Sequence, residues 1–231
     1  MERARLEQAW GRVAERIERA LRRAGRRDEV AVVVVTKGHP PAAVEAALAL
    51  GLRRCGESRV QELEEKVRAV GRERAEWHFI GHLQRNKVRR ALPLFDLIQS
   101  IDSLRLAEEL SREAVRAGRE VKGLVQVNTS GEPTKGGFAP AETLDAVGRI
   151  VTLPGLRIQG LMTIAPLTED EAVLRRTFRA ARELFEACAR AIAGFEPRHL
   201  SMGMSNDFEV AVEEGSTMLR LGTVLLGERP R

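Results

Sequence analysis

Apolar and polar positions along this chain follow two alternating spacings. The first stretch, residues 1–25, repeats apolar side chains every three or four positions and predicts an amphipathic helix: Leu6, Trp10, Val13, Ile17 and Leu21. After it, short apolar runs predict eight strands, at residues 30–37, 52–56, 77–81, 95–101, 123–128, 156–163, 198–202 and 217–222. The stretches between them predict helices, at residues 41–50, 60–70, 84–92, 103–117, 141–151, 169–193 and 207–214.

Strands that alternate with helices favour a parallel sheet with right-handed connections. Eight such strands close a (β/α)8 TIM barrel, and a length of 231 residues leaves room for the helix at residues 1–25. A doubly wound open sheet is the alternative, although no glycine-rich dinucleotide fingerprint follows the first strand. Because no linker or repeat interrupts the chain, we expect an α/β protein with one barrel domain over residues 1–231.

Composition narrows the possible partners and cellular location. The net charge is +5, but acidic and basic residues interleave along the helical faces, which indicates solvated, ion-paired helices rather than a nucleic-acid surface. No apolar run approaches the ~18 residues of a membrane span, and the charged N-terminus does not resemble a signal peptide. The two cysteines, Cys55 and Cys188, are far apart and predict neither a disulfide nor a metal site. We expect a cytoplasmic protein that binds no nucleic acid, membrane or metal.

A lysine stands at the end of the most apolar strand. The chain has only five lysines, and Lys37 directly follows the run from Val32 to Thr36. Side chains alternate along a strand, so Val33, Val35 and Lys37 share one face. In a barrel of this kind the chemistry lies at the carboxyl ends of the strands. An apolar surrounding lowers the pKa of an amine and makes it a nucleophile toward a carbonyl, so Lys37 is a candidate for Schiff-base chemistry.

The last two predicted strands carry a candidate anion site. The sequence SMGMSND, residues 201–207, ends the seventh strand, and Gly222 and Thr223 end the eighth. Barrels of this type often bind phosphate at these two loops. Either segment alone also reads as ordinary turn and helix-cap chemistry. Together they favour an anion site, and pyridoxal 5′-phosphate (PLP) combines a phosphate with an aldehyde that a lysine can bind.

An arginine in the eighth strand is expected to face the barrel interior. In TMLRLGT, residues 217–223, alternation directs Leu219 and Leu221 toward the helices, and therefore Met218 and Arg220 inward. A buried charge requires a partner or a ligand. A structural salt bridge to an acid on a neighbouring strand, such as Glu57, is the alternative to a ligand.

Several motifs resemble one protein family over residues 30–228. They are VVVVTKGHP, CGESRVQELEEK, WHFIGHLQRNK, QVNTSGEPTKGG, GLMTI and LSMGMSNDFEVAVEEGSTMLRLGTVLLGER. These stretches resemble the pyridoxal phosphate homeostasis proteins, the YggS/PROSC family. WHFIGHLQ followed by NK, together with LSMGMSND, is especially specific to that family.

The resemblance implies a barrel like the N-terminal domain of alanine racemase. It implies PLP held as a Schiff base on Lys37, phosphate contacts at Ser201 and at the backbone of Gly222 and Thr223, and Arg220 against the pyridine nitrogen. An arginine there leaves the ring unprotonated and makes it a poor electron sink. Members of the family are regarded as carriers and regulators of PLP supply, with no established catalysis.

Other matched positions differ from the family or have no clear role. Relatives often have Gly-Glu-Asn-Tyr where this chain has Gly-Glu-Ser-Arg at residues 56–59, so contacts of that asparagine do not carry over. Lys135 matches a family lysine and is a candidate second contact for PLP. His82 is expected near the mouth of the barrel, and no catalytic role is assigned to it.

Four functions remain to be distinguished. A PLP carrier is favoured over a PLP-dependent amino-acid racemase, because racemases of this fold use a tyrosine as the second base and this chain has no tyrosine. The sequence also ends soon after the eighth strand, so we expect no second domain over the mouth. A barrel binding another phosphorylated metabolite, with Lys37 as the nucleophile, is a third reading, and a structural module is the least favoured. We expect a non-catalytic monomer, with apo-PLP enzymes as candidate partners.

Overall fold

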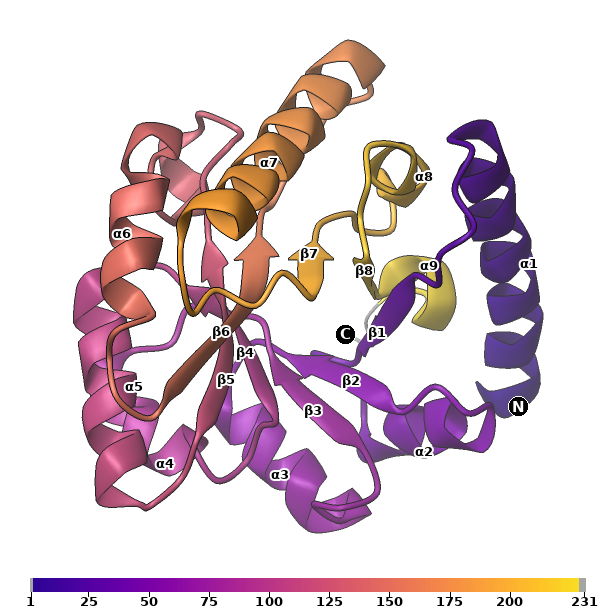
Figure 1. The fold of residues 1–231 in the computed structure, drawn as a ribbon. Coiled ribbons are helices and arrows are strands. Elements are labelled where there is room, and N and C mark those ends of the chain that lie inside the picture. Colours follow the sequence, from indigo (N-terminus) through magenta and orange to yellow (C-terminus); the bar gives the residue numbers. More distant parts are fainter. Residues whose placement is uncertain (1, 229–231) are drawn as a thin grey trace.

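The structure, a computed structural model that describes residues 2–228, contains a closed barrel of eight parallel strands (Figure 1). Each strand pairs with the next one in the sequence, and β8 pairs with β1. The strands are β1 (Ala31–Val35), β2 (Arg54–Glu57), β3 (Glu76–Phe79), β4 (Leu97–Ile101), β5 (Val121–Gln126), β6 (Leu156–Met162), β7 (His199–Ser201) and β8 (Met218–Leu221). The predicted TIM barrel is therefore confirmed, and the open sheet is excluded.

Helices surround the barrel on its outer side (Figure 1). They are α1 (Glu2–Arg23), α2 (Pro41–Ala49), α3 (Val60–Val70), α4 (Val88–Ala91), α5 (Leu104–Arg116), α6 (Thr143–Ile150), α7 (Glu171–Ala191), α8 (Phe208–Glu213) and α9 (Thr223–Leu226). Short 3-10 turns lie at η1 (Arg85–Lys87), η2 (Pro133–Lys135) and η3 (Pro140–Glu142). The helix predicted at residues 84–92 is thus η1 followed by the single turn α4, and α9 was not predicted.

The extra N-terminal helix covers the part of the barrel where β8 meets β1. Its apolar stripe is buried in the main core through Leu6, Val13 and Ile17, as the spacing predicted. The helix packs against α2, α8 and α9. Arg16 fastens it to α8, since its guanidinium lies 4.5 Å from the ring centre of Phe208 and 2.6 Å from Glu209.

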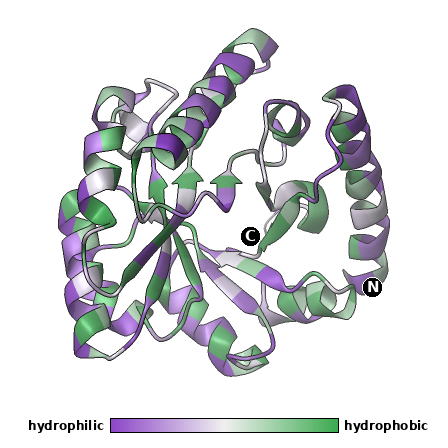
Figure 2. Ribbon diagram, in the orientation of Figure 1, coloured by the Kyte–Doolittle hydropathy of each residue, from purple (hydrophilic) through white to green (hydrophobic). Residues whose placement is uncertain are grey.

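The core has two layers, one between strands and helices and one inside the barrel. The outer layer contains most buried apolar residues, and the helices accordingly alternate hydrophobic and hydrophilic positions in Figure 2. The inner layer is a smaller cluster: Val33, Leu97, Leu124, Met162 and Met218. Met218 and Arg220 both face inward, which confirms the alternation predicted for β8.

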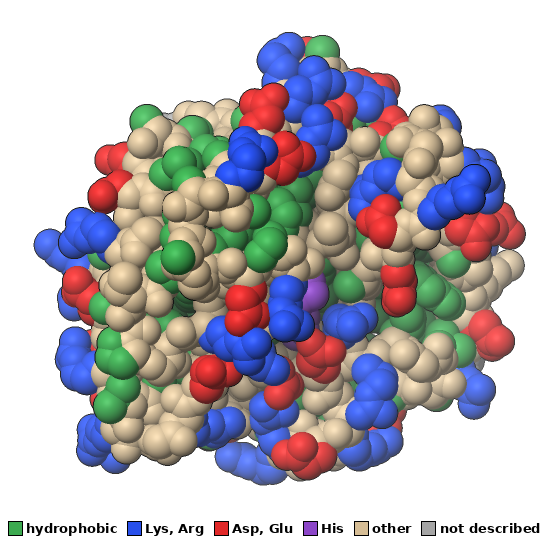
Figure 3. Space-filling view, in the orientation of Figure 1, with side chains coloured by type: hydrophobic (Ala, Val, Ile, Leu, Met, Phe, Trp, Pro, Cys, Tyr) green, Lys and Arg blue, Asp and Glu red, His purple; other side chains and the backbone are tan. Residues whose placement is uncertain are grey.

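Charged residues of both signs share the surface. On the face shown in Figure 3, lysine and arginine side chains are interspersed with aspartate and glutamate. Arg175 is an example, because its guanidinium lies 2.5 Å from Glu213 and 3.2 Å from Glu214. Among residues 2–228, no helix has the length and apolar character needed to cross a membrane.

Candidate functional site

A cavity of about 270 Å³ opens at the carboxyl ends of the strands. Its walls come from the turn after β1, the ends of β2 and β3, the loop 164–168, the turn 204–207 and the start of α9. Four of the five predicted site residues line it together: Lys37, Arg220, Gly222 and Thr223. We call this space the mouth cavity.

Lys37 reaches the mouth cavity because its neighbours hold the turn after β1 from below. Val35 and Lys37 line the cavity, whereas Thr36, which points the other way, is completely buried. The Lys66 amine of α3 donates to the Thr36 carbonyl at 2.6 Å, and the Gly38 backbone N–H donates to Glu62 at 2.8 Å. The backbone on both sides of Lys37 is therefore fixed by side chains of α3.

Beneath this turn lies a buried ion pair. The Lys66 Nζ atom is 2.5 Å from Glu57 Oε1, and the Thr36 hydroxyl donates to the same carboxylate. The other oxygen, Glu57 Oε2, is buried without a hydrogen-bond partner. Burial raises the pKa of Glu57, while Lys66 acts to lower it. Among the described residues Glu57 thus pairs with Lys66 and forms no ion pair with Arg220, so the predicted alternative of an Arg220–Glu57 salt bridge is wrong.

Arg220 forms part of the cavity floor while its side chain is almost fully buried. Its Nη1 donates to the Ser201 hydroxyl at 2.7 Å, and its Nη2 donates to the Thr163 carbonyl at 2.8 Å. Burial lowers the pKa of Arg220 to about 10, against the opposing effect of Asp207. The guanidinium therefore remains charged at neutral pH, although its hydrogen-bond partners are neutral groups.

Two backbone N–H groups converge on one oxygen at the start of α9. The amides of Gly222 and Val224 donate to the Ser205 hydroxyl at 3.3 and 3.2 Å. The turn that carries Ser205 is closed by the Met204 N–H, which donates to Asp207 at 2.6 Å. Two N–H donors and a hydroxyl at one point form a set of groups that suits a phosphate oxygen.

This cavity combines an amine, a buried guanidinium and convergent N–H donors, and the chain as a whole is similar to known proteins. The sequence matches the family described as alanine racemase, N-terminal domain, over residues 10–230. A curated relative from Aquifex aeolicus, named pyridoxal phosphate homeostasis protein, is 42% identical over 219 residues, covering 94% of this chain and 96% of the relative. The chain belongs to the pyridoxal phosphate homeostasis protein family.

Solved structures agree with this membership. The structure of PipY from Synechococcus elongatus with PLP bound is 38% identical, has a TM-score of 0.81, and covers 93% of this chain and 100% of PipY. An alanine racemase from Clostridium difficile is 18% identical with a TM-score of 0.74, covering 94% of this chain and 56% of the racemase. The racemase likeness shows the shared barrel fold alone.

Ser201 lies below the mouth cavity rather than in its lining, and its predicted phosphate contact stays a prediction. Its hydroxyl is completely buried below the mouth cavity, where it accepts from Arg220 and donates to Gln99 Oε1 at 2.7 Å. Ser205, on the turn after β7, lines the cavity instead. The geometry therefore favours Ser205 as the hydroxyl nearest a bound phosphate and gives Ser201 a different set of contacts.

Sequence reasoning also missed several cavity residues. Ser58 and Ile80 line the cavity at the ends of β2 and β3, and Asp207 lines it beside α8. The loop 164–168 forms another wall. The departure of Ser58 from the family asparagine was the one signal that marked this side of the mouth. The loop has no polar motif that would have distinguished it.

The two residues with open roles lie in different surroundings. Lys135 lines the mouth cavity, with its amine 3.4 Å from Glu132, so its role as a second PLP contact stays a prediction. His82 is largely exposed, and its ring nitrogen Nδ1 lies 2.6 Å from Asp102. It lines a separate surface hollow with Gln84 and Arg85, outside the mouth cavity.

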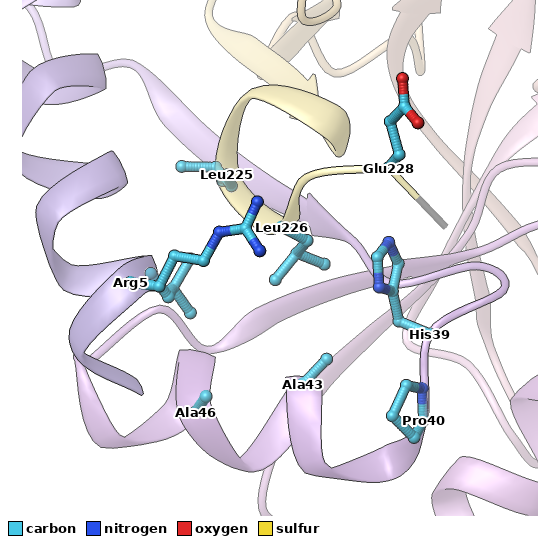
Figure 4. Close-up of a pocket in the computed structure, with 9 residues that line it drawn as sticks. Arg5, His39, Pro40, Ala43, Ala46, Leu225, Leu226 and Glu228 are labelled. Atoms are coloured by element: carbon cyan, nitrogen blue, oxygen red, sulfur yellow. The ribbon is translucent and has the colours of Figure 1, made fainter. Parts of the chain in front are cut away.

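A second cavity, of about 250 Å³, lies between α1, α2 and α9 (Figure 4). Its lining is mainly apolar and includes Leu225 and Leu226 of α9. Arg5, His39 and Glu228 contribute its polar groups. It shares α9 and the turn after Lys37 with the mouth cavity, but it contains none of the predicted site residues.

Proposed function

We propose that this chain binds PLP in the mouth cavity and acts as a carrier and regulator of PLP supply rather than as a catalyst. The observation that carries the proposal is the meeting of Lys37, Arg220 and the Gly222–Val224 amides in one cavity, in a chain of this family. Support comes from PipY, a 38% identical protein whose structure contains PLP. When bound, PLP supplies an aldehyde carbon that an amine can attack and a phosphate that anchors the molecule.

The residues of this chain fit such a ligand. Lys37 provides the amine for covalent attachment, and the backbone clamps from α3 keep it at the rim. Ser205 with the amides of Gly222 and Val224 receives the phosphate, and Thr223 begins the helix there. Arg220 would present a donor cation to the ring nitrogen of bound PLP, which would disfavour protonation of that nitrogen. These roles extend the expected set of Lys37, Arg220, Gly222 and Thr223 and replace Ser201 by Ser205 for the phosphate.

Racemase chemistry finds less support in the cavity. The sequence contains no tyrosine, the second base in racemases of this fold. The cysteines do not substitute for it, because both are buried away from the mouth and burial raises the pKa of Cys55 to about 12 and of Cys188 to about 11. With the ring nitrogen unprotonated, withdrawal of electrons from a substrate carbon is weak. The arrangement favours holding PLP over activating an amino acid.

The partners follow from the same proposal. A carrier must release PLP, so PLP-dependent enzymes without their cofactor are the expected receivers. We propose that the protein works as a monomer in the cytoplasm. Two cysteines without a disulfide support a reducing compartment.

The first test is the visible absorption spectrum of the purified protein mixed with PLP. A band that disappears on borohydride reduction, with the pyridoxyl mass on the peptide containing Lys37, is the expected result. Lys37→Ala removes both signals, whereas Lys135→Ala, a matched change at the other cavity lysine, retains them. A protein that stays colourless with PLP, or a label that moves to Lys135, contradicts the proposal.

A second measurement separates carrier from enzyme. The PLP-loaded protein is incubated with L-alanine, and the D-enantiomer is quantified by chiral chromatography. We expect no conversion above that of Lys37→Ala. Turnover that depends on Lys37 would establish the racemase alternative in place of the carrier.

A further inference from the structure

A line of hydrogen bonds crosses the barrel interior from the mouth to the opposite end. Beyond the bond from Arg220, Ser201 Oγ donates to Gln99 Oε1 at 2.7 Å. Gln99 Nε2 lies 2.7 Å from His78 Nδ1, and His78 Nε2 lies 3.0 Å from Glu76 Oε1. The line joins residues of β8, β7, β4 and β3, and we call it the barrel relay.

The chemistry of the groups fixes the direction of every bond in the barrel relay. A carboxylate only accepts, so the hydrogen on the His78 ring belongs on Nε2 and is donated to Glu76. In a ring with that single hydrogen the Nδ1 atom accepts, and its partner is the Gln99 amide NH₂ that faces it. The Gln99 oxygen accepts from Ser201, whose oxygen accepts from Arg220. All four bonds therefore donate away from the cation and toward the carboxylate, and aligned bonds of this kind polarise one another.

The middle of the barrel relay is inaccessible to solvent, and Glu76 at its far end is partly exposed. His78, Gln99 and Ser201 are completely buried, whereas the Glu76 side chain is 42% exposed. Glu76 lines a hollow of about 290 Å³ at the amino-terminal ends of the strands, opposite the mouth cavity. The hydrogen bond from His78 is the main cause that lowers the pKa of Glu76 to about 2. This carboxylate is therefore charged throughout the neutral range.

Other charged groups surround the exposed end. Arg54 on β2 lies 3.1 Å from Glu76, and His199 on β7 acts on it electrostatically. Three more lie around the same hollow: Asp96, Lys122 and Arg198. Within the barrel, by contrast, the described residues offer Arg220 only neutral acceptors. A buried arginine ordinarily pairs directly with a carboxylate, and here the relay connects Arg220 to the Glu76 carboxylate through a series of hydrogen bonds instead.

We infer that Glu76, His78, Gln99 and Ser201 are positioning residues that hold Arg220 in place as a cation at the floor of the mouth cavity. The inference rests on the proposed function where it concerns the PLP ring, since Arg220 is the group assigned to the ring nitrogen. The arrangement of the relay itself does not depend on PLP. It also gives Ser201 a task that is distinct from phosphate binding.

The arrangement can be tested in the full chain without PLP by ¹⁵N NMR of its four histidines. We expect the His78 ring hydrogen on Nε2, with Nδ1 as an acceptor. Gln99→Glu replaces the donor to Nδ1 with an acceptor, so the His78 ring should become doubly protonated. Gln159→Leu serves as control, because Gln159 is also a buried strand glutamine but bonds Glu196 outside the relay. Hydrogen on Nδ1 in the wild type, or a His78 signal unaffected by Gln99→Glu, overturns the relay.

The positioning role is then tested with PLP. Gln99→Leu and Ser201→Ala should each weaken PLP binding by about tenfold, the effect of one charge-assisted buried hydrogen bond, and should shift the absorption maximum. Thermal unfolding confirms that each variant is folded, and Gln159→Leu should bind like the wild type. Unchanged affinity and spectrum in both relay variants refute the positioning role. Failure of the wild type to bind PLP refutes the proposed function instead, and the NMR result still decides the arrangement of the relay.

Discussion

The buried pair of Lys66 and Glu57 gives a prediction whose size follows from the structure. Both side chains are nearly inaccessible, and the Lys66 amine is the charged partner of Glu57. In Lys66→Met the carboxylate loses that partner, while Glu57 Oε2 already lacks one. A buried carboxylate that cannot remain charged takes up a proton instead. The cost is then the free energy of protonating a group with an ordinary pKa of 4.5 at the working pH.

Each pH unit above 4.5 contributes about 1.4 kcal/mol, so Lys66→Met should lower the free energy of unfolding by about 3 kcal/mol at pH 7. The sign of the pH dependence follows from burial, which raises the pKa of Glu57 and is no longer opposed by Lys66 in the variant. The folded state holds a proton that the unfolded state releases above pH 4.5, so the variant is most stable at acid pH and loses stability as pH rises. The deficit relative to wild type should therefore shrink toward pH 5.

Urea denaturation at pH 5, 6, 7 and 8 measures this effect. Lys122→Met is the matched control, since Lys122 is exposed on β5 and its loss should change stability by less than about 0.5 kcal/mol. Replacing both partners, as in Glu57→Leu with Lys66→Met, removes the stranded charge and should recover most of the loss. A Lys66→Met deficit that is below about 1 kcal/mol at pH 7, or equal at every pH, refutes the reasoning.

Three further predictions concern single residues. Burial lowers the pKa of His199 to about 4, so stability should fall as pH drops from about 6.5 toward 4, because the unfolded chain takes up a proton there. His199→Asn should flatten this acid limb in pH-dependent thermal unfolding, and an unchanged limb contradicts the assignment. Gly203 has φ +96°, and an added Cβ would lie 2.6 Å from the Ala211 Cβ. Gly203→Ala should therefore lower the free energy of unfolding by about 2 kcal/mol or more in urea denaturation. Gly148→Ala is the control, because a Cβ at Gly148 meets open space. Ser205→Ala should weaken PLP binding about fivefold in a fluorescence titration through loss of one hydroxyl contact, whereas unaltered affinity would place the phosphate elsewhere.

The spacing of apolar and polar residues along the chain was enough to predict the strands and the direction of the side chains on them. The eight strands, the inward direction of Arg220 and the approach of Lys37 to the mouth follow from side-chain alternation and from the geometry of parallel barrels. The helix α9 was missed because a single turn of four residues has no periodicity to detect. The Glu57–Lys66 pair and the bond from Ser201 to Gln99 were missed because their partners lie on different elements, and residue spacing carries no information on which polar side chains meet across a barrel. Motif resemblance recognises the segment with both serines and points to Ser201, and only the three-dimensional structure shows that Ser205 is the one that lines the cavity.

The question of why a scarce lysine ends a buried strand has an answer in the charge balance of the mouth. Lys37, Lys135 and Arg220 line the mouth cavity, while Asp207 is the acidic residue among its lining, and burial raises the pKa of that acid. A cavity with this excess of positive charge favours a ligand with more than one negative charge, and a phosphate monoester carries close to two at pH 7. The Arg220 guanidinium is held by Ser201 and Thr163 below the cavity, and the backbone on both sides of Lys37 is held by α3, so the cavity needs little rearrangement when an anion enters. The Lys37 amine and the phosphate-binding end lie in one cavity, and this arrangement suits a ligand that carries an aldehyde and a phosphate on the same ring. This feature favours PLP over a phosphorylated metabolite without a carbonyl.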